Sequence, residues 1–134
     1  MYVMRFLIDT QIFLWFVAGS SDLKENIKIL LEDENNEIYL SIASLWEISI
    51  KTALGKLAIA GDYETVIDDV VENGMEILNI NFAHTVEQNK LDFHHKDPFD
   101  RLIAAQAIVE RVNLISSDEI FDSYFIGKSV KRIW

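Results

Sequence analysis

The chain has no cysteine among its 134 residues, a single proline and only five glycines. The absence of cysteine excludes disulfide bonds and thiolate metal ligands. Lysine and arginine are also scarce, with 12 of them against 22 aspartates and glutamates, for a formal net charge of -10. This balance argues against tight non-specific binding to nucleic acid, which relies on basic side chains neutralising phosphates. It does not exclude a nucleic-acid enzyme in which part of the acidity serves to bind a metal.

Long apolar runs are missing as well. The longest clean run near the N-terminus, Ile12 to Ala18, is too short to span a bilayer, and charged or polar residues interrupt the segment before it. We therefore expect no signal peptide and no membrane association. There is no internal repeat, flexible linker or glycine-rich phosphate loop. Because half of the residues are hydrophobic and the length suits one core, we expect a single domain over residues 1–134. The lack of disulfides fits a cytoplasmic location.

Short apolar segments alternate with segments of helical periodicity along the whole chain. The pattern predicts strands at 2–8, 37–40, 76–80 and 112–115, with an edge strand at 130–133. It predicts helices at 11–17, about 22–33, 42–54, 62–72, about 81–90 and 98–111, and a helical turn at 118–121. Strands that alternate with helices indicate an α/β fold, a three-layer sandwich with a mainly parallel central sheet.

Acidic residues stand where the predicted strands end and where helices begin. Asp9 and Asp118 follow two strands, whereas Glu47 and Asp100 lie in the first turns of two helices. In a parallel sheet the ligand site lies beyond the carboxyl ends of the strands. Because those helices enter from the same edge, we expect the four carboxylates to converge.

Such a cluster is unfavourable without a counter-charge. Two carboxylates about 5 Å apart repel by roughly 3 kcal/mol at an effective dielectric near 20. Oxygen ligands without cysteine suit Mg²⁺ or Mn²⁺. Such an ion activates water and offsets charge on a phosphate oxygen, so the acids indicate metal-assisted phosphodiester hydrolysis.

Each acid also has a structural explanation. Asp9, Asp97 and Asp118 can each cap the helix that follows, and Asp100 stands at a capping-box position. Glu47 can be a solvated helix residue, although its apolar neighbours favour a place near the core. Capping alone does not explain why the acids gather at one edge of the sheet.

Two other groups of residues have structural interpretations. His94 and His95 lack the i, i+4 spacing of a zinc pair, so we expect them in a loop. The aromatic residues Phe13, Trp15 and Phe16 are expected in the core or at a dimer interface rather than as a base-stacking platform.

Four segments of the chain, in this order, resemble the conserved blocks of PIN-domain ribonucleases, and in particular of VapC-type toxins of bacterial toxin–antitoxin pairs. They are FLIDTQIFLW (6–15), SIASLWEISIK (41–51), DPFDRLIAAQA (97–107) and LISSDEIF (114–121). The third block is the most specific of them. The resemblance places the family's acids on Asp9, Glu47, Asp100 and Asp118 as catalytic and metal-binding residues.

The resemblance implies an endoribonuclease that depends on Mg²⁺ or Mn²⁺, forms a homodimer and is neutralised by a small antitoxin that covers the site. Thr10 and Ser117 match hydroxyl positions that help to hold such a site together. Arg101 follows the third acid and is expected to support either the structure or the substrate phosphate. Because the chain is so acidic, we expect nearby basic residues such as Lys51 and Lys56 to contact RNA.

Two alternatives from other classes stay open at this point. A receiver-like signalling domain would accept a phosphoryl group in a Mg²⁺ pocket, but it needs an acid pair after the first strand, where Asp9 stands alone. A non-catalytic module would use the same acids to bind a basic peptide.

Overall fold

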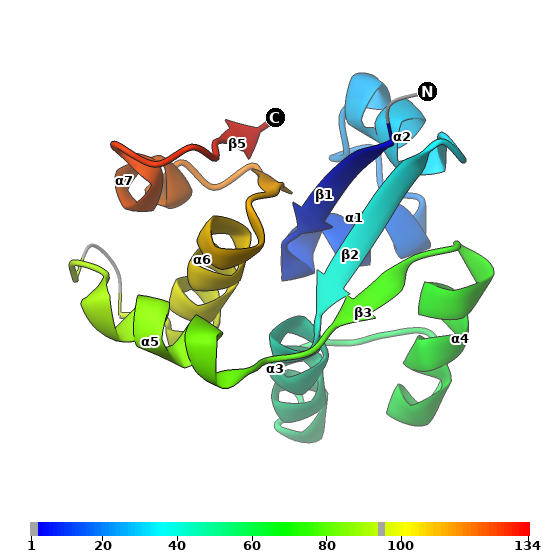
Figure 1. Cartoon of the computed structure of the whole chain (residues 1–134). Helices are drawn as coiled ribbons and strands as arrows, with labels where there is room; N and C mark the ends of the chain where they lie inside the picture. The colour runs from blue at the N-terminus through cyan, green and yellow to red at the C-terminus, as the bar shows by residue number, and fades with distance from the viewer. Residues whose placement is uncertain (1–2, 94–95) are drawn as a thin grey trace.

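The fold is organised around one five-stranded sheet with the order β3-β2-β1-β4-β5, in which every neighbouring pair is parallel (Figure 1). The computed structural model describes residues 3–93 and 96–134. The strands are β1 (Met4–Ile8), β2 (Asn36–Ser41), β3 (Glu76–Leu78), β4 (Asn113–Ile115) and β5 (Arg132–Ile133). The predicted α/β fold is therefore confirmed, with the expected edge strand parallel to the rest. Tyr2 of the first predicted strand, and His94 and His95, lie outside the described residues.

Seven α-helices and one 3-10 turn connect and cover the strands of the described chain. They are α1 (Thr10–Ala18), α2 (Glu25–Glu32), α3 (Ile42–Ala53), η1 (Tyr63–Thr65), α4 (Val66–Glu72), α5 (Phe82–Lys90), α6 (Pro98–Glu110) and α7 (Ile120–Phe125). Within residues 3–93 and 96–134, no helix has both the length and the apolar character needed to cross a membrane.

The sheet separates two hydrophobic cores. On β1, Phe6 and Ile8 join the core that also includes residues of α1, α2 and α4, whereas Leu7 joins the core under α6 and α7. This alternation follows from the two-residue period of a strand, and a strand buried on both faces reads as a continuous apolar run. The aromatic cluster belongs to the first core. Phe13 is buried within it, and Trp15 and Phe16 pack against it.

Local side-chain and backbone features fix several of the helix ends. Ser41 caps α3, Asn81 caps α5 and Asp97 caps α6, each through a side-chain bond to a backbone N–H. Gly19 adopts the left-handed conformation that ends α1, with φ of 63°.

Several boundaries differ from the sequence prediction, and strands β3 and β5 are shorter than predicted. Helix α2 begins at Glu25 and not near residue 22, because residues 20–23 form a turn in which the Ser20 hydroxyl accepts from the Asp22 N–H. The segment predicted as one helix at 62–72 starts with the 3-10 turn η1. The helical turn predicted at 118–121 is the longer helix α7.

The central strand positions the site. β1 pairs with β2 on one side and with β4 on the other. From β1 the chain adds β2 and β3 toward one edge of the sheet and then returns to add β4 and β5 on the other side of β1, so the strand order reverses between β1 and β4. Immediately after β1, the Asp9 N–H donates to the Ile115 carbonyl over 3.2 Å, which ties the ends of β1 and β4 together. Beyond these ends lies the crevice where α/β sheets bind their ligands.

Candidate active site

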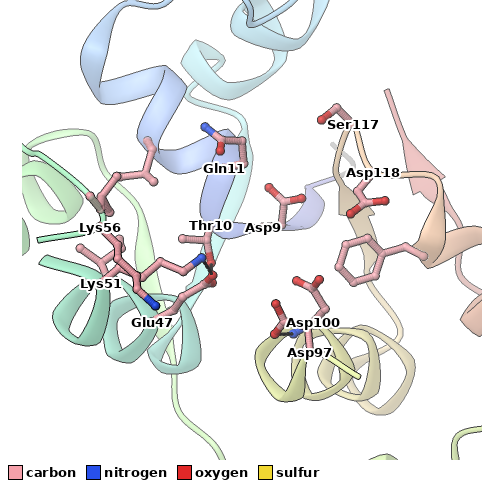
Figure 2. A pocket seen from close by; sticks show the side chains of 14 residues that line it. Asp9, Thr10, Gln11, Glu47, Lys51, Lys56, Asp97, Asp100, Ser117 and Asp118 are labelled. Atoms are coloured by element: carbon pink, nitrogen blue, oxygen red, sulfur yellow. Dashed lines mark hydrogen bonds and ion pairs between the residues drawn. The ribbon is translucent and has the colours of Figure 1, made fainter. Parts of the chain in front are cut away.

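A pocket of about 520 Å³ opens at the carboxyl ends of β1 and β4. It brings together side chains from the β1–α1 junction, helix α3, the start of α6 and the loop after β4. The acids that line it are Asp9, Glu47, Asp97, Asp100 and Asp118. Figure 2 shows that Asp9, Asp100 and Asp118 are directed toward the same open space, while Glu47 is turned toward Thr10. All four acids expected at the site therefore line one cavity.

Asp9 is the most deeply placed of these acids that face the open space, with only 6% of its surface exposed. It is the N-cap of α1, and its Oδ1 accepts from the Ile12 N–H over 2.8 Å. Burial raises its pKa from 3.8 to about 6; bonds from the Ser116 hydroxyl and the Ile12 N–H oppose the rise, and the charges of Asp118 and Glu47 add to it. Capping therefore explains the bond from the Ile12 N–H but does not balance the charge of Asp9.

Glu47 is as buried as Asp9, with 6% of its surface exposed, so the interpretation as a solvated helix residue is wrong. Helix α3 begins at the end of β2 and turns Glu47 inward. Glu47 is the sixth residue of α3 and lies in its second turn, not in the first turn as expected from the sequence. Its Oε1 accepts from the Thr10 hydroxyl over 2.7 Å, and its Oε2 pairs with the Lys51 Nζ over 2.5 Å. The Thr10 hydroxyl is also 2.9 Å from that of Ser44, which links α1 to α3 at the site.

The two acids of α6 have different roles. Asp97 is the cap, since its Oδ1 accepts from the N–H groups of Phe99 and Asp100 over 2.8 and 3.2 Å. Pro98 stands at the first helical position, where the missing N–H costs nothing. Asp100, three residues after the cap, lines the pocket from the first turn.

Asp118 closes the pocket on the side of β4. Its Oδ1 accepts from the Ile120 N–H over 3.0 Å, so it contributes to the start of α7 as well as lining the pocket. Ser117 lines the pocket beside it.

Ser116 is a site residue that sequence reasoning missed. It is fully buried, its hydroxyl donates to Asp9, and its Oγ accepts from the Asp118 N–H over 3.0 Å. This one hydroxyl thus links the carboxylate of Asp9, after β1, to the backbone of Asp118, after β4. The spacing Ser-x-Asp after a strand, which suits a serine turn, was the available signal.

Arg101 does not line the pocket. Its guanidinium is buried and donates to the carbonyls of Gln88, Leu91 and Asp92 over 2.9 to 3.0 Å, at the C-terminal end of α5. Of the two roles left open for Arg101, the structure favours support of the α5–α6 connection over contact with substrate phosphate.

We expect Arg101→Met to lower the free energy of unfolding by about 3 kcal/mol, because it leaves buried carbonyls without donors and removes charge-assisted bonds. Urea denaturation measures this change. Lys28→Met, which alters an exposed lysine on α2, is the matched control. A loss below about 0.5 kcal/mol, the size of an ordinary surface change, would contradict this role of Arg101.

The residues fit a hard divalent cation. The lining offers oxygen donors and no thiolate, and the buried Asp9 has its pKa raised, so the pocket favours an added positive charge. In the described residues, no three acidic or histidine side chains are arranged so that they could hold one ion together. Mg²⁺ keeps several of its waters and needs only one or two direct carboxylates. Asp9, Asp100 and Asp118, which face the open space of the pocket, are the carboxylates available to such an ion.

Comparison with solved structures shows the same fold. The chain is 20% identical to the protein in the crystal structure of VapBC2 from Rickettsia felis bound to a promoter DNA fragment, with a TM-score of 0.70 over 97% of this chain and 98% of that chain. VapBC-1 from nontypeable Haemophilus influenzae gives 17% identity and a TM-score of 0.67, with 97% of both chains covered. FitAcB from Neisseria gonorrhoeae gives 18% identity and a TM-score of 0.63, with 96% of both chains covered. No curated protein matches the chain.

The family comparison covers most of the chain. The model of the PIN domain matches residues 6–125, a range that contains Asp9, Glu47, Asp100 and Asp118. This match confirms the resemblance read from the four sequence blocks, and the all-parallel sheet is the fold shared with the solved structures. The chain belongs to the PIN-domain family.

Proposed function

We propose that this PIN domain is an endoribonuclease that depends on Mg²⁺ or Mn²⁺ and acts as the toxin of a toxin–antitoxin pair. The observation that carries the proposal is the convergence of a buried Asp9 with Glu47, Asp100 and Asp118 in one pocket at the β1–β4 switch point. Nucleases are typical of the family. The family match favours this activity over the receiver-like phosphoacceptor and over a non-catalytic peptide-binding module.

Asp9, Glu47, Asp100 and Asp118 would hold the cation, directly or through water. When bound, the metal supplies a water activated for attack on the phosphorus and offsets charge on the phosphate oxygens. The protein's own groups keep the carboxylates in place. Ser116 orients Asp9, Thr10 orients Glu47, and the Asp97 cap fixes the first turn of α6 that carries Asp100.

The names of the similar structures support a proposal about partners. The similar structures include complexes named VapBC and a toxin–antitoxin complex from Klebsiella pneumoniae. We propose by analogy that a small cognate antitoxin covers the pocket and that the toxin forms a homodimer in the cytoplasm, where its RNA substrate is found. Large apolar side chains that are exposed on the described chain, such as Trp46 and Phe82, are available to such interfaces.

Expression in a bacterial host tests the toxin activity. We expect induction of the wild-type chain to arrest growth, and Asp100→Ala to restore it, because the pocket loses a carboxylate while the Asp97 cap of α6 remains. Asp68→Asn, which alters an exposed acid of α4 outside the pocket, is the matched control and should stay toxic. Immunoblots establish equal protein levels. Equal toxicity of Asp100→Ala and wild type would contradict the assignment of the site.

A further inference from the structure

Lys51 forms an ion pair with Glu47, one of the four acids proposed to hold the cation. It lies one helical turn after Glu47 on α3, and its Nζ contacts Oε2 over 2.5 Å. The other oxygen of Glu47 accepts from Thr10. Both carboxylate oxygens are thus engaged by side chains of the protein (Figure 2).

The surroundings keep Lys51 positively charged. The ammonium bonds to Glu47, while Asp97 and Asp100 line the same pocket, and a lysine is ordinarily charged at neutral pH. The ammonium is therefore a resident cation on the α3 wall of a pocket lined by five acids. It explains how the buried Glu47 is tolerated when no metal is bound, since a buried charge is costly unless it is paired.

The two partners differ in their freedom to move. The Lys51 side chain is 47% exposed, whereas that of Glu47 is 8% exposed. Lysine carries its charge at the end of a flexible four-carbon stem and is strongly hydrated. When another cation binds Glu47, the ammonium of Lys51 can move toward solvent while the carboxylate of Glu47 stays in place.

We propose that Lys51 is a built-in counter-ion of Glu47, which a divalent cation displaces and which then contacts a phosphate of the bound substrate. This deepens the proposed function and depends on it for the identity of the substrate. Lys56 lines the same wall, so the displaced ammonium joins a second basic side chain beside the acids. A chain with net charge -10 thereby gains a local basic edge at the pocket that the substrate must approach.

Metal affinity gives the decisive test, because a displaced counter-ion predicts that removing Lys51 strengthens metal binding. Titration of the apo protein with Mn²⁺ by calorimetry should show tighter binding to Lys51→Met than to wild type, by roughly three- to fivefold, since a partly exposed ion pair is worth up to about 1 kcal/mol. Lys51→Arg keeps the charge and should bind as wild type does. Lys128→Met removes a lysine of the same net charge from the ion pair with Glu87, outside the pocket, and should leave the affinity unchanged. Unchanged or weaker Mn²⁺ binding by Lys51→Met would overturn the proposal.

For the RNA substrate the expected effect is the opposite, because removing Lys51 should weaken binding. With saturating Mn²⁺ and single-stranded RNA, Lys51→Met should raise KM several-fold, and the slope of log(kcat/KM) against log[salt] should fall by about 0.7, the value for one phosphate contact on a single strand. An unchanged KM and slope would overturn the phosphate contact. If the wild type cleaves no RNA while Lys51→Met still binds Mn²⁺ more tightly, the counter-ion stands and the proposed function fails.

Discussion

Asp9→Asn is expected to abolish RNA cleavage, lowering kcat by at least about a hundredfold, because even residues that only support a metal ligand contribute 10–100-fold. The amide keeps the size of the side chain and can still cap α1, since asparagine is as good an N-cap as aspartate. The change thus removes the charge while preserving the bond to the Ile12 N–H.

The same substitution should stabilise the metal-free protein. The Asp9 pKa is raised from 3.8 to about 6, and one pKa unit corresponds to about 1.4 kcal/mol, so the ionised carboxylate costs up to about 3 kcal/mol at pH 7. Removing it should raise the free energy of unfolding by roughly 1–3 kcal/mol. Cleavage assays and urea denaturation of the same samples measure the two effects. Loss of activity accompanied by loss of stability would mean that Asp9 mainly supports the fold.

The second large effect is on pH dependence, which should run opposite to that of a salt-bridged carboxylate. The folded protein keeps the Asp9 proton up to about pH 6, whereas an unfolded chain releases it near the ordinary pKa of 3.8. Between these values the folded state binds more protons, so its stability falls as pH rises. The contribution of Asp9 is fully favourable below pH 4 and is lost above about pH 6.

Other acids titrate in the same range, so the comparison must isolate Asp9. The free energy of unfolding of Asp9→Asn minus that of wild type, measured without metal from pH 4 to pH 7.5, should increase by about 3 kcal/mol. Adding Mn²⁺ should reduce or reverse this difference at pH 7.5, because the ion stabilises only the folded wild type. A pH-independent difference would show that Asp9 titrates normally and that its burial imposes no electrostatic cost.

Much of the fold could be predicted because its signals are local. The continuous apolar run of β1 and the capping residues Ser41 and Asp97 each encode their element within a few neighbours. The parallel orientation of the strands then follows from their alternation with helices. This orientation brings Asp9 and Asp118, which follow two of the strands, to one edge of the sheet.

The remaining features depend on tertiary contacts. The start of α2 was misplaced because Ser21 and Asp22 are residue types that suit a helix cap. Only the folded turn shows that the Asp22 N–H bonds to Ser20 and that the helix begins later. The role of Arg101 was undecided because its partners are carbonyls at the end of α5. The neighbours of Arg101 in the sequence do not show that these carbonyls lie within its reach. The bridge made by Ser116 needs β1 and β4 side by side.

The engagement of Glu47 was not foreseen for a related reason. An i, i+4 pair such as Glu47 and Lys51 is common on exposed helix faces, where it contributes little. Its meaning changes because α3 turns Glu47 into a pocket of acids, and only the fold reveals that burial.

The central claim is that folding creates one divalent-cation site among these carboxylates. The most direct measurement is the anomalous scattering of Mn²⁺ in crystals grown near pH 8, above the Asp9 pKa of about 6. We predict an anomalous peak in the pocket, within coordination distance of Asp9 and Asp118, which is lost in Asp9→Asn crystals. A pocket without a peak at saturating Mn²⁺, or a peak that persists unchanged in Asp9→Asn, would contradict the account.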